Sequence, residues 1–253
     1  KSKDEMALRF NDVSPLENMH CAKLFEIMTK PKFNMLIGFP ESDWREIRKI
    51  VIKAILGTDM VHHFACVKSI NLFYEVHHDN IYKWYTGDAD TIDIFSEPDE
   101  KYQVIKWLLH TADVSNPYKP FHICEKWAHL VVEEFHSQGD KEREKGYEVS
   151  EMNDRNSTSS LCNLQMGFIQ FMIEPLVTAM VQTFPGLLEI GSNLRSNFDT
   201  WAQKRIEEIS NDDTISDKST EIEKLKERNN KFGGNMSATI DKISSLKRKY
   251  PII

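Results

Sequence analysis

The sequence lacks the features that define several classes of protein. Its four cysteines lie far apart and form no C-x-x-C pair, which is typical of buried thiols in a reducing compartment. The net charge of -7 excludes the basic face of a general nucleic-acid-binding protein. The longest apolar stretch, Met166 to Phe184, is interrupted by polar residues and a proline. It therefore predicts a buried helix and no membrane contact from this segment.

Strand patterns and familiar site motifs are also missing. The sequence shows no internal repeat and no alternation of apolar and polar residues of the kind seen in half-buried strands. It contains no G-x-x-x-x-G-K, G-x-G-x-x-G, G-x-S-x-G or H-E-x-x-H motif, which excludes the sites that those motifs mark. Apolar residues recur at helical spacing instead. We expect a compact all-α fold made of many helices.

Local signals predict several helix boundaries. The S-P-L-E segment at residues 14–17 has the form of a capping box at a helix start. The N-P pair at residues 116–117 should end the helix that begins near residue 96, because the residue before a proline avoids the α conformation. Residues 79–96, with Gly87 and four aspartates, predict a loop. Further helices are expected at residues 121–138, 160–182 and 187–209.

The C-terminal part of the chain differs in composition from the rest. Residues 210–253 are rich in charge and poor in aromatic side chains. This pattern predicts an exposed helix, a break near Gly233 and Gly234, and a second helix. We therefore divide the chain into a main helical domain at residues 1–209 and a charged helical extension at residues 210–253.

Asp113 is the most informative single residue. It lies at the end of an apolar helix, four residues before Pro117. A carboxylate among apolar residues is costly unless a metal, a cation or several donors satisfy it. A cap on the next turn is the plain structural interpretation, and a metal ligand is the functional one. Both stay open from the residues alone.

Gln165 and Phe168 lie one turn apart on another apolar helix. An amide offers a donor and an acceptor that suit a purine edge, and an aromatic face suits its ring. A helix interior with one tolerated polar residue explains the same pattern. His62 and His63 are neighbours that would point to different helix faces, so we expect them to be surface or satisfied histidines.

Several motifs in a fixed order resemble those of one enzyme family. They are F-N-D at 10–12, L-E-N at 16–18, T-D-M at 58–60, H-T-A-D-V-S-N-P at 110–117, E-E-F at 133–135, Q-G-D at 138–140, R-E at 143–144 and Q-M-G-F-I at 165–169. Together they resemble the catalytic domain of class I 3′,5′-cyclic nucleotide phosphodiesterases over residues 6–201. The resemblance implies the C-terminal portion of an all-helical catalytic domain.

The resemblance also implies a reaction, the hydrolysis of a 3′,5′-cyclic nucleotide to its 5′-monophosphate. In this family a zinc ion and a magnesium or manganese ion activate a hydroxide for in-line attack on phosphorus, as two-metal sites do. Cyclic AMP is the favoured substrate, and cyclic GMP is a second one.

Residue roles follow from the matched motifs. Asp113 is similar to the family's downstream zinc ligand, and Glu17 resembles the acidic residue that holds water around the second metal. Gln165 is similar to the purine-binding glutamine. The other expected substrate contacts are Phe168 and Val131, which resemble a hydrophobic clamp, and Asn116, Met60 and Met152, which resemble pocket-lining residues.

The sequence also departs from the family. It lacks the H-N-x-x-H and H-D motifs that carry the general acid and the other metal ligands, and we expect these before Lys1. Cys124 stands where tyrosine is frequent. The alternatives are a non-catalytic cyclic-nucleotide-binding module of the same fold and a helical interaction scaffold. We expect a location on the cytoplasmic side, with any tethering by regions outside this chain, and a homodimer is compatible with the sequence.

Overall fold

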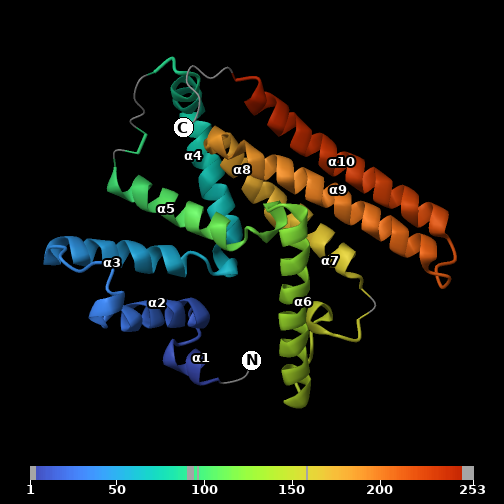
Figure 1. Cartoon of the computed structure of the whole chain (residues 1–253), viewed down its shortest axis with the longest axis horizontal. Coiled ribbons are helices and arrows are strands. Elements are labelled where there is room, and N and C mark those ends of the chain that lie inside the picture. The colour runs from blue at the N-terminus through green and yellow to red at the C-terminus, as the bar shows by residue number, and fades with distance from the viewer. Residues whose placement is uncertain (1–3, 90–93, 96, 158, 247–253) are drawn as a thin grey trace. The chain divides into compact units, whose positions relative to one another are not determined.

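The computed structural model describes residues 4–89, 94–95, 97–157 and 159–246, and these residues form helices and no strand. The predicted all-α class is confirmed. The chain divides into two compact units, one made of residues 1–72 and 91–113 and the other of residues 73–90 and 114–253, in so far as these are described. Figure 1 shows the helices of both.

The first unit is built around helix α3. Its elements are α1 (Glu5–Arg9), α2 (Pro15–Met28), η1 (Pro31–Phe33), α3 (Glu41–Leu56), η2 (Met60–His62), the beginning of α4 (His63–Thr86) and α5 (Pro98–Asp113). Helix α3 packs against both α2 and α5. Trp107 on α5 donates a hydrogen bond from Nε1 to the Oγ atom of Ser69 on α4, at 2.8 Å. Together these contacts fix the end of α5, where Asp113 lies.

The second unit is built around the long pair α9 and α10. Its elements are the rest of α4, η3 (Asn116–Tyr118), α6 (Phe121–Glu144), η4 (Glu151–Asn153), α7 (Leu161–Phe168), the π-helical turn η5 (Ile169–Ile173), α8 (Glu174–Thr183), η6 (Pro185–Leu187), α9 (Leu188–Asn211) and α10 (Lys218–Ser244). Helices α9 and α10 pack side by side along most of their length, as Figure 1 shows.

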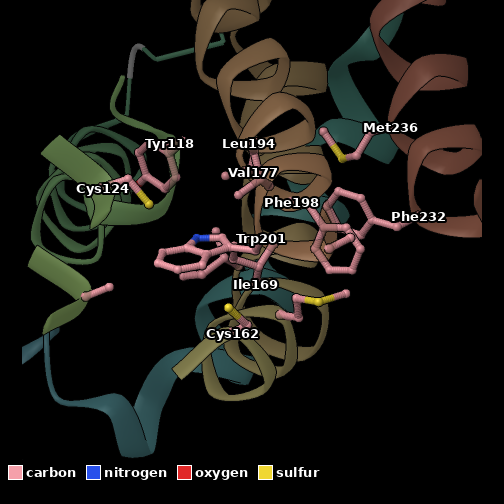
Figure 2. Packing of buried hydrophobic residues seen from close by; sticks show 14 of the residues in the cluster. Tyr118, Cys124, Cys162, Ile169, Val177, Leu194, Phe198, Trp201, Phe232 and Met236 are labelled. Atoms are coloured by element: carbon pink, nitrogen blue, oxygen red, sulfur yellow. The ribbon is translucent and has the colours of Figure 1, made fainter. Parts of the chain in front are cut away.

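Aromatic and sulfur-containing side chains fill the core of the second unit (Figure 2). The rings of Phe198 and Phe232 stack with their centroids 3.8 Å apart and their planes 13° apart. Trp201 is 1% exposed and packs edge-on against Phe121. All four cysteines of the chain are buried free thiols, as their spacing predicts.

The segment Leu161–Thr183 is by itself long and apolar enough to span a membrane, judged by length and composition. Part of its apolar surface lies in the core of the second unit, where Met166, Ile169, Ile173 and Val177 are fully buried, while Phe171 is 65% exposed. This is the burial expected of a core helix. The structure divides the predicted helix at 160–182 into α7, a π turn and α8.

The predicted capping box at residues 14–17 is wrong. Ser14 has a left-handed backbone, with φ of 40°, and its hydroxyl caps no amide of α2. The hydroxyl instead donates to the Oδ2 atom of Asp59, at 2.7 Å. A contact with a residue 45 positions away therefore replaces the local cap.

The predicted loop at residues 79–96 is wrong in its first part, because α4 continues to Thr86. Ile81 is only 2% exposed, so burial extends the helix. Gly87 ends it with a positive φ of 81°, which glycine adopts at little cost. Residues 90–93 and 96 of that loop lie outside the described residues.

The predicted break near Gly233 and Gly234 is also wrong, since α10 runs through both glycines without interruption. Phe232 and Met236, on either side of the pair, are each 1% exposed. The helix is therefore held by the apolar face that it buries against its neighbours, which outweighs the weak helix propensity of glycine.

Candidate functional site

The end of α5 carries the predicted metal ligand of the first unit. Asp113 is the last residue of α5, which ends before the N-P pair as expected. The residue is exposed, but the surrounding chain raises the pKa of its carboxyl by burial, and His20 opposes that rise. Glu17 lies one turn before His20 on α2 and is half-buried. The two predicted carboxylates thus belong to the same unit.

His63 and His110 form a buried pair near the end of α5, and His110 precedes Asp113 by one turn. The Nδ1 atom of His63 lies 2.9 Å from the Nε2 atom of His110, and both side chains are 0% exposed. His62, by contrast, is exposed, which confirms that the neighbouring histidines point to different faces. The pair was not predicted, although the position of His110 three residues before Asp113 places these two residues on one helix face.

Met60 begins the short η2 turn, which Asp59 anchors. The Asp59 carboxylate accepts hydrogen bonds from the Val61 amide at 2.9 Å and from Ser14 at 2.7 Å. These bonds lower the pKa of Asp59. Met60 itself is 40% exposed. The turn is therefore fixed by Asp59, while the thioether beside it keeps surface available for contact.

Two amide side chains of the second unit have unsatisfied oxygens. Gln165 on α7 is 5% exposed, and its Oε1 atom is buried without a hydrogen-bond partner among the residues that the structure describes, as is the Oδ1 atom of Asn116. Leaving a buried acceptor unpaired costs about 1–3 kcal/mol. The η3 turn that carries Asn116 is itself held firmly, because Asn197 donates to the carbonyls of Pro117 and Lys119 at 2.8 and 2.7 Å.

The predicted clamp residues lie on α7 and α6. Phe168 is one turn after Gln165, so both project from the same face of α7. Phe168 is partly buried and packs against the core, and Val131 on α6 is half-buried. The side chains of Gln165 and Phe168 can therefore meet one ligand from a single helix.

Met152 lies on a loop that ion pairs and close packing hold against α6. Arg155 binds both carboxylate oxygens of Glu133 at 2.8 Å and one of Asp140 at 3.1 Å. Gly139 lets the loop approach closely, because a Cβ atom there would overlap the carbonyl oxygen of Asn153. Met152 is 49% exposed on this fixed loop.

The predicted residues thus divide between the units. Asp113, Glu17 and Met60 belong to the first, while the second holds Gln165, Phe168, Val131, Asn116 and Met152. Within the part of the chain that the structure describes, no group of three His, Cys, Asp or Glu residues could hold a metal ion. A catalytic zinc takes about three protein ligands. The described residues therefore do not fit a complete metal site, and the metal role of Asp113 stays a prediction.

Comparisons with known proteins agree with the motifs. The sequence model of the 3′5′-cyclic nucleotide phosphodiesterase family matches residues 1–194. The probable 3′,5′-cyclic-AMP phosphodiesterase pde-4 of Caenorhabditis elegans is 32% identical over 208 residues, which are 82% of this chain and 29% of that protein. The high affinity cGMP-specific 3′,5′-cyclic phosphodiesterase 9A of Homo sapiens is 30% identical over 190 residues, which are 75% of this chain and 29% of that protein.

Solved structures give the same result. The phosphodiesterase domain of the RhoPDE fusion protein from Salpingoeca rosetta has a TM-score of 0.67 and 29% identity, over 79% of this chain and 59% of that one. LmjPDEB1 in complex with IBMX has a TM-score of 0.63 and 28% identity, over 75% of this chain and 52% of that one. The chain spans less than a third of the curated relatives it matches. It belongs to the 3′,5′-cyclic nucleotide phosphodiesterase family.

Proposed function

We propose that this chain forms the nucleotide-binding part of a phosphodiesterase site that hydrolyses cyclic AMP, and also cyclic GMP, to the 5′-monophosphates. The observation that carries the proposal is the buried Gln165 amide, whose Oε1 atom has no partner. A purine edge would satisfy that acceptor and remove its desolvation cost. Relatives named for cyclic AMP and for cyclic GMP match 82% and 75% of the chain.

In this proposal Phe168 and Val131 hold the two faces of the base, while Asn116, Met60 and Met152 line the pocket. Apolar contact on both faces of the ring would exclude water and strengthen the amide hydrogen bonds.

Substrate choice follows from the freedom of the Gln165 amide. An amide that can turn presents its acceptor to the amino group of adenine or its donor to the carbonyl of guanine. Cys124 is fully buried in the core and has no hydroxyl with which to lock the amide, as a tyrosine could. We therefore favour cyclic AMP with measurable turnover of cyclic GMP.

The family as a whole depends on divalent metal ions. We propose the finer assignment that Asp113 binds zinc and that Glu17 holds water around a magnesium or manganese ion. Bound metals of this kind polarise phosphoryl oxygens and lower the pKa of water. The place of Asp113 and Glu17 in the same unit supports the assignment.

The second candidate function is a non-catalytic cyclic-nucleotide-binding module. The absence of a three-residue metal group among the described residues favours it. One experiment separates the two candidates: hydrolysis of cyclic AMP and cyclic GMP by the full-length polypeptide is measured with added zinc and magnesium, and with chelator as control. Metal-dependent turnover supports the enzyme, and saturable binding with no turnover supports the module. If the polypeptide neither binds nor hydrolyses a cyclic nucleotide, the helical interaction scaffold is the remaining alternative.

A further inference from the structure

A small pocket lies between α7, α9 and α10 in the second unit. Its cavity has a volume of about 170 Å³ and is lined by Asn163, Arg205, Ile209, Glu221, Lys224, Leu225 and Arg228. Asn163 is two residues before Gln165 on α7, and two helical residues are separated by about 200° of rotation. The pocket therefore opens on the face of α7 opposite the predicted base-binding residues.

The pocket is more positive than the chain as a whole, which carries a net charge of -7. Two of its three cations have carboxylate partners: Lys224 pairs with Glu221 at 2.9 Å, and Arg205 pairs with Glu208 at 2.8 Å. The third cation, Arg228, has no carboxylate within ion-pair distance among the residues that the structure describes. One positive charge in the pocket is therefore uncompensated.

Arg228 is held in a fixed orientation. Its Nε atom donates to the Oε1 atom of Gln170 at 2.7 Å, and its guanidinium carbon lies 5.8 Å from the ring centroid of Phe198. The residue is half-buried, and burial lowers its pKa. The neutral amide of Gln170 occupies Nε and leaves the two terminal nitrogens, with four N–H donors, for another acceptor.

We propose that this pocket binds a small oxyanion of the phosphate type. Two parallel N–H bonds from a guanidinium suit two oxygens of a phosphoryl group. The Asn163 amide and the Lys224 ammonium line the same cavity and supply further donors. Free inorganic phosphate and the phosphate of a nucleoside monophosphate present the same group. The proposal does not depend on the catalytic one, since none of the pocket residues is a predicted site residue.

The test is a titration of the whole chain with inorganic phosphate, followed through the arginine Nε–H signals in ¹H–¹⁵N NMR spectra. Chloride at equal ionic strength is the reference. We expect a saturable shift of the Arg228 signal with phosphate and not with chloride. Arg228→Gln should weaken phosphate binding, measured by calorimetry, by roughly tenfold or more. Lys226→Gln removes the same charge from an exposed position on α10 and should leave binding unchanged.

Further arms keep the test decisive if Arg228→Gln perturbs folding. Arg228→Lys keeps the positive charge but loses the paired N–H donors of the guanidinium, and Lys224→Gln removes a second donor. Both variants should bind phosphate more weakly while their thermal unfolding, followed by circular dichroism, matches that of wild type. A titration with AMP identifies the source of the phosphate. AMP binding that depends on Arg228 and persists in Gln165→Ala indicates a nucleotide phosphate. Binding of inorganic phosphate without binding of AMP at this pocket indicates the free ion. The proposal is overturned if phosphate causes no saturable shift beyond that of chloride. It is also overturned if Arg228→Gln, Arg228→Lys and Lys224→Gln all bind phosphate as tightly as the wild-type chain.

Discussion

The imidazoles of His63 and His110 form a buried pair, with Nδ1 of the first 2.9 Å from Nε2 of the second. A neutral imidazole carries one N–H and one lone pair, so one ring donates and the other accepts. Burial, assisted by the positive field of His63 and Lys106, lowers the pKa of His110 to about 4. His110 is therefore held neutral at physiological pH, one turn before Asp113.

This pair predicts a pH dependence of stability. The unfolded chain binds a proton on His110 as the pH falls below 6.5, while the folded chain binds it only near pH 4. Stability is therefore lost as the pH falls through that window, by up to about 3 kcal/mol. Urea unfolding of wild type and His110→Gln between pH 7 and pH 4 checks this, because the carboxylates common to both cancel in the difference. The variant's curve should be flatter, and parallel curves would contradict the assignment.

Gly139→Ala should displace the loop that carries Met152. A Cβ atom at this position would overlap the Asn153 carbonyl oxygen, so we expect a loss of about 1–3 kcal/mol in stability together with weaker cyclic AMP binding. Gly234→Ala is the matched control, because a Cβ atom there meets no atom within 4 Å and should stabilise α10 by up to about 1 kcal/mol. Unfolding curves and calorimetry measure both effects. Equal stability of Gly139→Ala and wild type would show that the loop backbone is not packed closely against Gly139.

Phe232→Ala should destabilise the second unit by about 3–5 kcal/mol, since it removes a buried aromatic ring and leaves a cavity. The ring stacks on Phe198 at 3.8 Å and belongs to the main core. Lys231→Ala, at an exposed neighbouring position, should change stability by less than about 0.5 kcal/mol. Denaturant unfolding measures both variants. Similarly small losses of stability in Phe232→Ala and Lys231→Ala would mean that α10 contributes little to the core.

Local chemistry was enough to predict part of the fold and site. The N-P pair at 116–117 predicts the end of α5, which lies at Asp113, three residues before the pair. The loop expected from residue 79 and the break expected near Gly233 depend on more than local propensity: burial of Ile81, Phe232 and Met236 extends both helices. Tertiary contacts override weak propensities of this size.

The histidine pair and the Arg228 pocket could not be predicted for a related reason. His63 and His110 are 47 residues apart, and Arg228 meets Gln170 across 58 residues. Nothing in either local sequence distinguishes these side chains from surface residues. Gln165 and Phe168 could be suggested from the sequence because both lie on one short helical motif, and their role as site residues stays a prediction.

Residues 1–253 by themselves should hold no stoichiometric zinc and show no cyclic AMP turnover. The matched motifs supply one zinc ligand, Asp113, and about three are needed. Elemental analysis of the purified chain after dialysis against zinc, with a turnover assay in parallel, measures both quantities. One tightly bound zinc per chain together with turnover would mean that histidines such as His20, His62 or His63 are ligands, and that the assigned roles are wrong.

The central claim is that α7 presents Gln165 to a purine, and calorimetric titration of the chain with AMP and cyclic AMP tests it most directly. Gln165→Ala should weaken binding by about tenfold, or roughly 1.4 kcal/mol. Gln203→Ala, which removes an exposed amide from α9, should leave the affinity unchanged. Saturable wild-type binding that falls only in Gln165→Ala is the predicted result. Absence of nucleotide binding, or equal affinity in both variants, would contradict the claim.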